Sequence, residues 1–158
     1  MAASTYRLRI LHDLMLALHF YLDVDTTTSS DIHRGDLIEM KLTDQTAILM
    51  DDDEVTSGYK FVGISNSVWE TNMDQSALRK TIEVLGMCIC EATVVSGTYQ
   101  IGQLLQYDVT NDDGRLENWE TGNQAIGWVI ACGTGTITKL EILVNVLDPS
   151  TGLLEVSS

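Results

Sequence analysis

Basic side chains are scarce in this sequence of 158 residues, which has 9 Lys and Arg against 23 Asp and Glu and a net charge of −14 at pH 7. A surface this acidic repels phosphate backbones, so the composition argues against a nucleic-acid partner. It suits a protein that stays soluble at high copy number or that meets a basic partner. Hydrophobic residues make up 44% of the chain, which is enough for the packed core of one domain or two very small ones.

Cysteine and long hydrophobic runs are also scarce. The cysteines Cys88, Cys90 and Cys132 form no Cys-x-x-Cys pair and lie far from any histidine in sequence, so we expect buried free thiols rather than a zinc site. No apolar stretch approaches the roughly 18–20 residues of a membrane-spanning helix. The N-terminal apolar run is interrupted by His12 and Asp13, unlike a signal peptide. We expect a protein with no membrane partner.

The sequence also lacks a catalytic constellation. His12, His19 and His33 all precede or begin the β-rich part of the chain, and none sits in a nucleophile or metal motif. The carboxylates at 51–54 lack the alternation of a calcium-binding loop, so we interpret them as a solvated turn. We therefore expect no metal, no cofactor and no enzyme, although the many carboxylates leave a glycosidase-like pair open.

Residues 5–24 carry apolar side chains at alternating spacings of three and four, which predicts a helix. Apolar residues occupy the opposite face too, so such a helix would need burial on more than one side. It would pack either on its own domain or on another subunit, and an extended arm is the alternative to a helix. The polar stretch 23–31 then reads as a flexible linker. The apolar stripe contains Leu8, Leu11, Met15, Leu18 and Leu22.

From Arg34 onward the apolar period changes to two, as in strands with one buried face. Asp113-Gly114 supplies the positive φ of a tight hairpin turn, and the glycine within 61–64 indicates a bulge or a close backbone approach. The longest interruption is the polar segment 65–80, which carries Trp69. That tryptophan could either contact a partner or cover one end of the β-rich domain.

The β-rich part contains an internal repeat. Each half reads as strand, turn, short strand, turn, glycine-broken strand, loop and long strand. The first two matches lie at offsets of 67 and 64 residues. The matched segments are 35–42 with 102–109, 61–64 with 125–128, and 81–85 with 139–143.

Two such halves predict a mainly β fold, a small antiparallel β-barrel or sandwich with an N-terminal helix or arm. We expect the helix or arm and its linker over residues 1–30 and the β-barrel domain over residues 31–147. The tail over residues 148–158 is expected to fray.

The strand pattern resembles the small β-barrel decoration, or cement, proteins of tailed-phage capsids, including tulip-shaped ones. In that family a Gly-x-Leu-Val-Tyr-like strand, a polar hairpin, a Gly-Val-Ala-like strand and a closing strand recur. The resemblance covers residues 34–146, and the chain departs from it in its longer N-terminal segment and its loop at 65–80. The matching segments are 34–38, 61–64, 80–91, 101–108, 125–129 and 139–144.

The resemblance implies a homotrimer on the outer surface of the virion that binds the major capsid protein and stabilises the head by clamping its neighbouring subunits. A virion-displayed module that binds carbohydrate or a host surface is the alternative, with Trp69 or Trp119 stacking on a sugar. For the capsid contact we predict a set of six apolar residues that lie in or beside the departures from the family pattern. They are Leu8, Leu11, Met15, Leu18, Leu22 and Trp69.

Overall fold

The computed structural model describes residues 6–22, 31–43, 45–50, 59–68, 81–108, 110–111 and 113–146. This part contains nine strands and no helix, so the expected mainly β fold is confirmed. The strands are β1 (Arg9–Leu22), β2 (Leu37–Lys41), β3 (Thr46–Leu49), β4 (Tyr59–Ser65), β5 (Thr81–Gly97), β6 (Leu104–Tyr107), β7 (Leu116–Asn118), β8 (Gly127–Ala131) and β9 (Ile137–Asn145).

The predicted N-terminal helix or arm is wrong, because β1 is a long strand of the sheet. It pairs antiparallel with β5 from Arg9 opposite Glu91 to Tyr21 opposite Thr81. Register shifts interrupt this pairing at three places: extra residues lie in β1 at Leu11 and at residues 14–15, and the pairing shifts again between Leu16 and Ala17. Each extra residue moves the following side chains to the other face of the strand. The two-residue period is lost along β1, which leaves apolar residues at the spacings of three and four that imitate a helix.

Five strands in the order β1-β3-β2-β4-β5 form a small closed barrel, because β5 also pairs with β1. We call it the first ring. Its neighbouring strands are antiparallel except β1 and β3, which are parallel. Closure leaves the ring without a free sheet edge, the feature that makes an open sheet prone to pairing with other chains.

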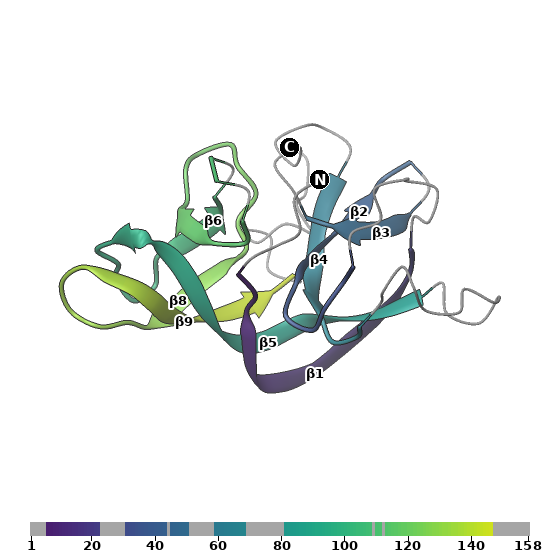
Figure 1. Ribbon diagram of the computed structural model, residues 1–158, viewed down its shortest axis with the longest axis horizontal. Coiled ribbons are helices and arrows are strands. Elements are labelled where there is room, and N and C mark those ends of the chain that lie inside the picture. The colour runs from purple at the N-terminus through teal and green to yellow at the C-terminus, as the bar shows by residue number, and fades with distance from the viewer. Residues whose placement is uncertain are drawn as a thin grey trace.

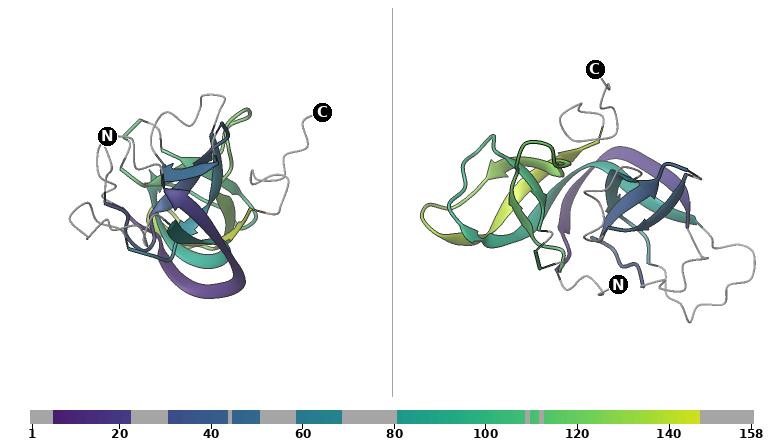
Figure 2. Two further views of the ribbon diagram at one scale, coloured as in Figure 1. Left: turned by 90° about the vertical axis from the view of Figure 1, so that its right-hand side faces the viewer. Right: turned by 90° about the horizontal axis from the view of Figure 1, so that it is seen from above.

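A second ring follows the same design with the order β5-β7-β6-β8-β9, closed by the pairing of β5 with β9. The two rings lie side by side, and β5 crosses both of them (Figure 1). Residues 81–91 of β5 pair with β1, whereas residues 87–97 pair with β9. The view from above separates the blue strands of the first ring from the green and yellow strands of the second (Figure 2).

The two rings repeat one another in register as well as in strand order. In both, the first and third strands are parallel and the other four pairings are antiparallel. The offsets of 67 and 64 in the sequence therefore have a structural counterpart, with β5 serving as the last strand of one copy and the first of the next. Matching pairs are Leu22–Ala47 with Val94–Leu116, Leu18–Val84 with Cys90–Ile142, and Ile38–Gly63 with Leu105–Gly127.

The glycine-broken strands β4 and β8 approach their neighbours unusually closely. A Cβ on Gly63 would overlap the carbonyl oxygen of Leu85, and one on Gly127 would lie 2.7 Å from the carbonyl oxygen of Leu143. Gly63 also has a φ of 135°, a value that other residues rarely adopt. The sequence predicted a bulge or a close approach at Gly63, and the close approach is found there; Gly127 makes a second one that was not predicted.

The buried apolar residues form two clusters, a smaller one within the first ring and a larger one that runs from the first ring through β5 into the second. Cys88 and Cys90 are buried in the larger cluster as free thiols, as predicted, and Cys132 is partly buried. Between the rings, the Phe61 N–H donates a hydrogen bond of 2.9 Å to Gln124 Oε1. The fully buried side chains include Phe61, Ile64, Leu85, Leu105, Leu116, Ile126 and Ile142.

Candidate functional site

Two counterpart loops lead into the second strand of each copy: the first loop, residues 31–36, and the second loop, residues 98–103. Their backbones are fixed in the same way. The Gly35 N–H donates to the Ser65 carbonyl and the Gly102 N–H to the Val129 carbonyl, each over 2.8 Å. Both glycines have positive φ, 96° and 85°. The two loops are therefore the same structure, and what differs is what lies on them.

A polar side chain closes each loop from within. In the first loop Asp36 Oδ2 accepts the His33 N–H at 2.7 Å, and in the second loop Gln103 Oε1 accepts the Gln100 N–H at 3.0 Å. Gln103 also donates from Nε2 to Asn118 Oδ1 at 2.7 Å. The neutral amide of Gln103 thus accepts the same backbone hydrogen bond as the carboxylate of Asp36. The turn therefore does not require the negative charge of Asp36.

The N-terminal segment 6–8, which we call the cover, lies across the first loop. The Leu8 N–H donates to the Gly35 carbonyl at 2.9 Å, and a Cβ on Gly35 would overlap the Leu8 carbonyl oxygen. Arg7 Nε lies 2.8 Å from Asp36 Oδ1, and Arg7 Nη2 lies 3.2 Å from His33 Nδ1. The Asp36 charge therefore holds the cover in place, and glycine at position 35 provides the room for it.

Asp36 is fully buried, and burial raises the pKa of its carboxyl above the ordinary 3.8. The His33 N–H and the positive charge of Arg7 lower that pKa without cancelling the effect of burial. The Arg7 side chain is 35% exposed, so water screens part of its attraction to the carboxylate. The ion pair positions the cover more than it stabilises the fold.

Among the residues that the structure describes, none covers the second loop in this way. Residues 81–86, the part of β5 that precedes its pairing with β9, are already paired with β1 and β4 in the first ring, so they cannot fold back onto this loop as residues 6–8 do in the first copy. A Cβ on Gly102 would meet nothing within 4 Å. In the part of the chain that the structure describes, no backbone N–H donates to the Gly102 carbonyl.

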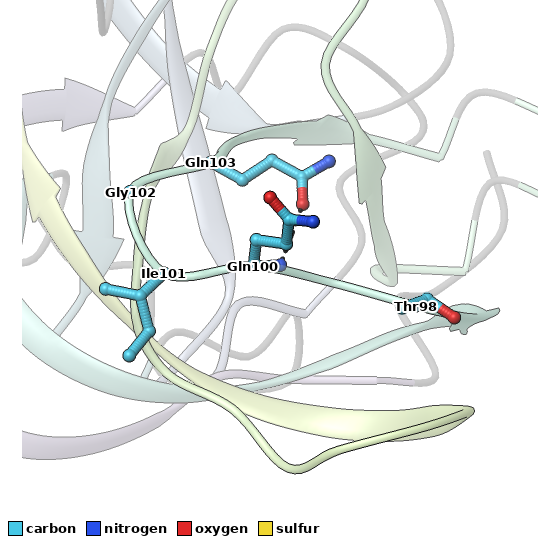
Figure 3. A pocket seen from close by; sticks show the side chains of 5 residues that line it. All are labelled: Thr98, Gln100, Ile101, Gly102 and Gln103. Atoms are coloured by element: carbon cyan, nitrogen blue, oxygen red, sulfur yellow. Dashed lines mark hydrogen bonds between the residues drawn. The ribbon is translucent and has the colours of Figure 1, made fainter.

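The second loop forms an open depression of about 500 Å³, lined by residues 98 and 100–103. Figure 3 shows the side-chain amides of Gln100 and Gln103 near each other, while Ile101 points away from them. Ile101 is 70% exposed, more than any other large apolar side chain among the described residues. The lining carries no charged residue, although the protein as a whole is strongly acidic.

Of the six predicted contact residues, only Leu8 and Leu11 have side chains that the structure describes. Leu8 is 3% exposed and packs in the core of its own chain, and Leu11 is partly buried at a register shift of β1. The side chains of Met15, Leu18 and Leu22, and all of Trp69, lie outside the described residues. The apolar character of Leu8 is explained by its place in the hydrophobic core.

The acidic residues of the hairpin between β6 and β7 stabilise the turn. Asp108 Oδ1 accepts the backbone N–H groups of Thr110 and Asn111 at 3.1 and 3.3 Å, and Gly114 has the expected positive φ of 88°. Arg115 Nη2 lies 3.0 Å from Asp113 Oδ2. The acidic residues 51–54 lie outside the described part of the chain.

Other features relevant to function are few. No group of three or more His, Cys, Asp or Glu side chains in the described ranges could hold a metal ion. Those ranges also contain no helix that could cross a membrane. Trp119, an alternative sugar-stacking residue, is partly buried and donates its indole N–H to the Asn123 carbonyl at 2.6 Å.

Sequence reasoning missed the second loop, although the signal was present. The offset that aligns Gly102 with Gly35 also aligns Ile101 with Arg34. One copy thus has an exposed charged residue at this turn position, and the other has an exposed apolar one. An apolar side chain at a turn tip becomes notable only when the two halves are compared.

Comparison with known proteins does not assign the chain to a family. The sequence matches no family model, and a search of curated proteins finds no relative.

Proposed function

We propose that this protein is a structural virion protein that decorates the outside of an icosahedral phage head and clamps neighbouring major capsid protein subunits. One observation carries the proposal: the glycine-broken strands β4 and β8 recur at matched places in two copies of one five-stranded ring. The family resemblance rests on strands of this kind.

The architecture supports a mechanical role. The two rings share β5, so a force applied to one ring is carried through continuous backbone and paired strands into the other. Closed rings leave little edge for unwanted pairing at high copy number. The net charge of −14 adds repulsion between free copies. These are useful properties for a protein required in many copies per particle.

The proposed clamp works by mass action. A protein that binds only the expanded lattice stabilises that lattice by the free energy of its binding, in the way that a ligand stabilises the state it prefers. A homotrimer at a three-fold position would contact several subunits at once, which raises the effective concentration of each further contact.

Sedimentation of purified heads with added protein tests the proposal. We expect saturable binding to mature, expanded heads at a fixed ratio, weaker binding to unexpanded heads, and a higher temperature of head disruption in its presence. Absence of binding to heads of the phage that encodes the chain would contradict the proposal.

A carbohydrate-binding module is the second candidate, favoured by the neighbouring side-chain amides of Gln100 and Gln103 in an open depression. Amide groups can both donate to and accept from sugar hydroxyls. Specific signals on a glycan array that Gln100→Ala abolishes would support this candidate, and an array without signals would count against it.

A further inference from the structure

We infer that the second loop is a docking site for an extended segment of the major capsid protein, which would lie on it as the cover lies on the first loop. The inference rests on the proposed function, which supplies the partner. What it adds is the site, residues 98–103, and the form of the ligand, an extended backbone.

The first copy serves as an internal template for the ligand. There an extended segment donates one backbone N–H to the carbonyl of a positive-φ glycine and lies so close that only glycine fits beneath it. The second loop presents the same glycine, with its carbonyl and the space above it open. A peptide segment fits this arrangement because its N–H groups recur at regular intervals along an extended chain.

The side chains indicate what kind of segment it is. Where the first loop uses Asp36 to hold a basic residue, the second has the neutral Gln103. Where the first loop exposes Arg34, the second exposes Ile101. The expected segment therefore presents an apolar side chain to Ile101 and needs no charge at this point.

Charge also favours another protein over a second copy of this chain. Each copy carries a net charge of −14, so contact between two copies adds repulsion that an oppositely charged or neutral partner avoids. The loop is small compared with a typical interface of about 800 Å² per partner, so it is one anchoring contact within a larger surface.

Gly102→Asn tests the site with little strain on the fold. Asn tolerates positive φ, and nothing lies within 4 Å of the new Cβ, so the free protein has room for the side chain. A segment docked as Leu8 is docked on Gly35 would collide with it. The matched control is Gly135→Asn, because Gly135 also has a positive φ, 79°, and equally open surroundings in the turn between β8 and β9.

The measurement is the affinity of full-length protein for purified mature heads, titrated by sedimentation, beside a urea-unfolding midpoint for each variant. We expect Gly102→Asn to weaken head binding at least about tenfold, as loss of an anchoring contact does, and Gly135→Asn to leave it unchanged. Head binding by Gly102→Asn at wild-type strength would overturn the inference while leaving the proposed function intact. If wild-type protein fails to bind, the proposed function fails and the inference fails with it.

A second pair of variants covers a failure of Gly102→Asn to fold. Ile101→Asp removes the exposed apolar contact, and Leu42→Asp makes the same change at an apolar side chain that is 48% exposed elsewhere. Only Ile101→Asp should weaken head binding, and equal effects of the two would contradict the site. Solution mass is the last readout: an oligomer that Gly102→Asn dissociates would show that the occupant is a second copy, which overturns the assignment to the capsid protein.

Discussion

Replacing Gly63 by alanine adds one methyl group, yet we expect it to cost much of the stability of the protein. The new Cβ would overlap the carbonyl oxygen of Leu85 and lie 2.8 Å from its carbonyl carbon. Both atoms belong to the backbone of β5, the strand shared by the two rings, so they cannot move aside as a flexible side chain would. The φ of 135° adds strain for any residue with a Cβ.

The size of the effect follows from two terms. Conformational strain at positive φ costs about 1–2 kcal/mol, and forcing a methyl group into a packed interior costs about 1–3 kcal/mol. Together they predict that the free energy of unfolding falls by about 2–5 kcal/mol, a large share of the roughly 5–15 kcal/mol of a typical domain.

Together with Gly63→Ala, the variants Gly127→Ala and Gly97→Ala should form a series of decreasing loss of stability. Gly127 lacks the positive φ but would place its Cβ 2.7 Å from the Leu143 carbonyl oxygen, so only the packing cost of about 1–3 kcal/mol applies. At Gly97 the nearest atom to the new Cβ is 3.5 Å away, so stability should stay level or rise by up to about 1 kcal/mol, because alanine restricts the unfolded chain.

Urea unfolding followed by tryptophan fluorescence measures the series. With a slope of about 1–3 kcal/mol per molar urea, the change expected for Gly63→Ala lowers the midpoint of unfolding by about 0.7 M or more. The reasoning would be refuted if Gly63→Ala unfolded at the same urea concentration as Gly97→Ala, because the close approach of β4 to β5 would then carry no energetic weight.

Three further predictions concern the cover and the first loop. Leu8→Ala should lower the free energy of unfolding by about 2–5 kcal/mol in urea titrations, because Leu8 is buried in the core; a change under about 0.5 kcal/mol would contradict this. Asp36→Ala should cost about 1–3 kcal/mol by the same assay, since it leaves the His33 N–H without its acceptor and Arg7 without its counter-ion, and Asp36→Asn should recover the part due to the turn. Burial raises the pKa of Asp36 above 3.8, so the folded protein holds the carboxyl proton more tightly than the unfolded chain does. The contribution of Asp36 to stability is therefore greatest below pH 3.8 and is lost as the pH rises through the raised pKa. The stability of wild type relative to Asp36→Asn, measured by urea unfolding at a series of pH values, should therefore fall with rising pH; a rise would contradict the direction of the shift.

Much of the β architecture could be predicted because its signals are local. Alternation marks strands such as β2 and β9, and Asp113-Gly114 marks a turn that demands positive φ. The repeat was also visible, since Gly63 and Gly127 each permit a backbone approach that no other residue allows. These residues are constrained by geometry that a short stretch of sequence reveals.

The N-terminal strand could not be predicted, because its pattern depends on pairing with residues some 70 positions away. The register shifts of β1 match the course of β5, and without the partner strand their apolar spacing looks helical. Removing residues 1–24 would consequently take a strand out of the first ring instead of releasing an arm, so truncation is a poor test of partner binding.

The candidate site escaped sequence reasoning for a related reason. Nothing in residues 98–103 is chemically unusual, and Ile101 alone is an ordinary apolar residue. Its meaning comes from the absence of a cover over the second loop, which follows from β5 having already been used as the closing strand of the first ring. That consequence of topology appears only when the copies are compared in three dimensions.

A cryo-electron microscopy reconstruction of mature heads carrying the protein would show whether it clamps capsid subunits through the second loop. We predict density for the paired five-stranded rings on the outer surface, with an extended segment of a capsid subunit crossing the second loop and one backbone N–H facing the Gly102 carbonyl. Heads without the rings, or rings whose second loop points into solvent, would contradict the account.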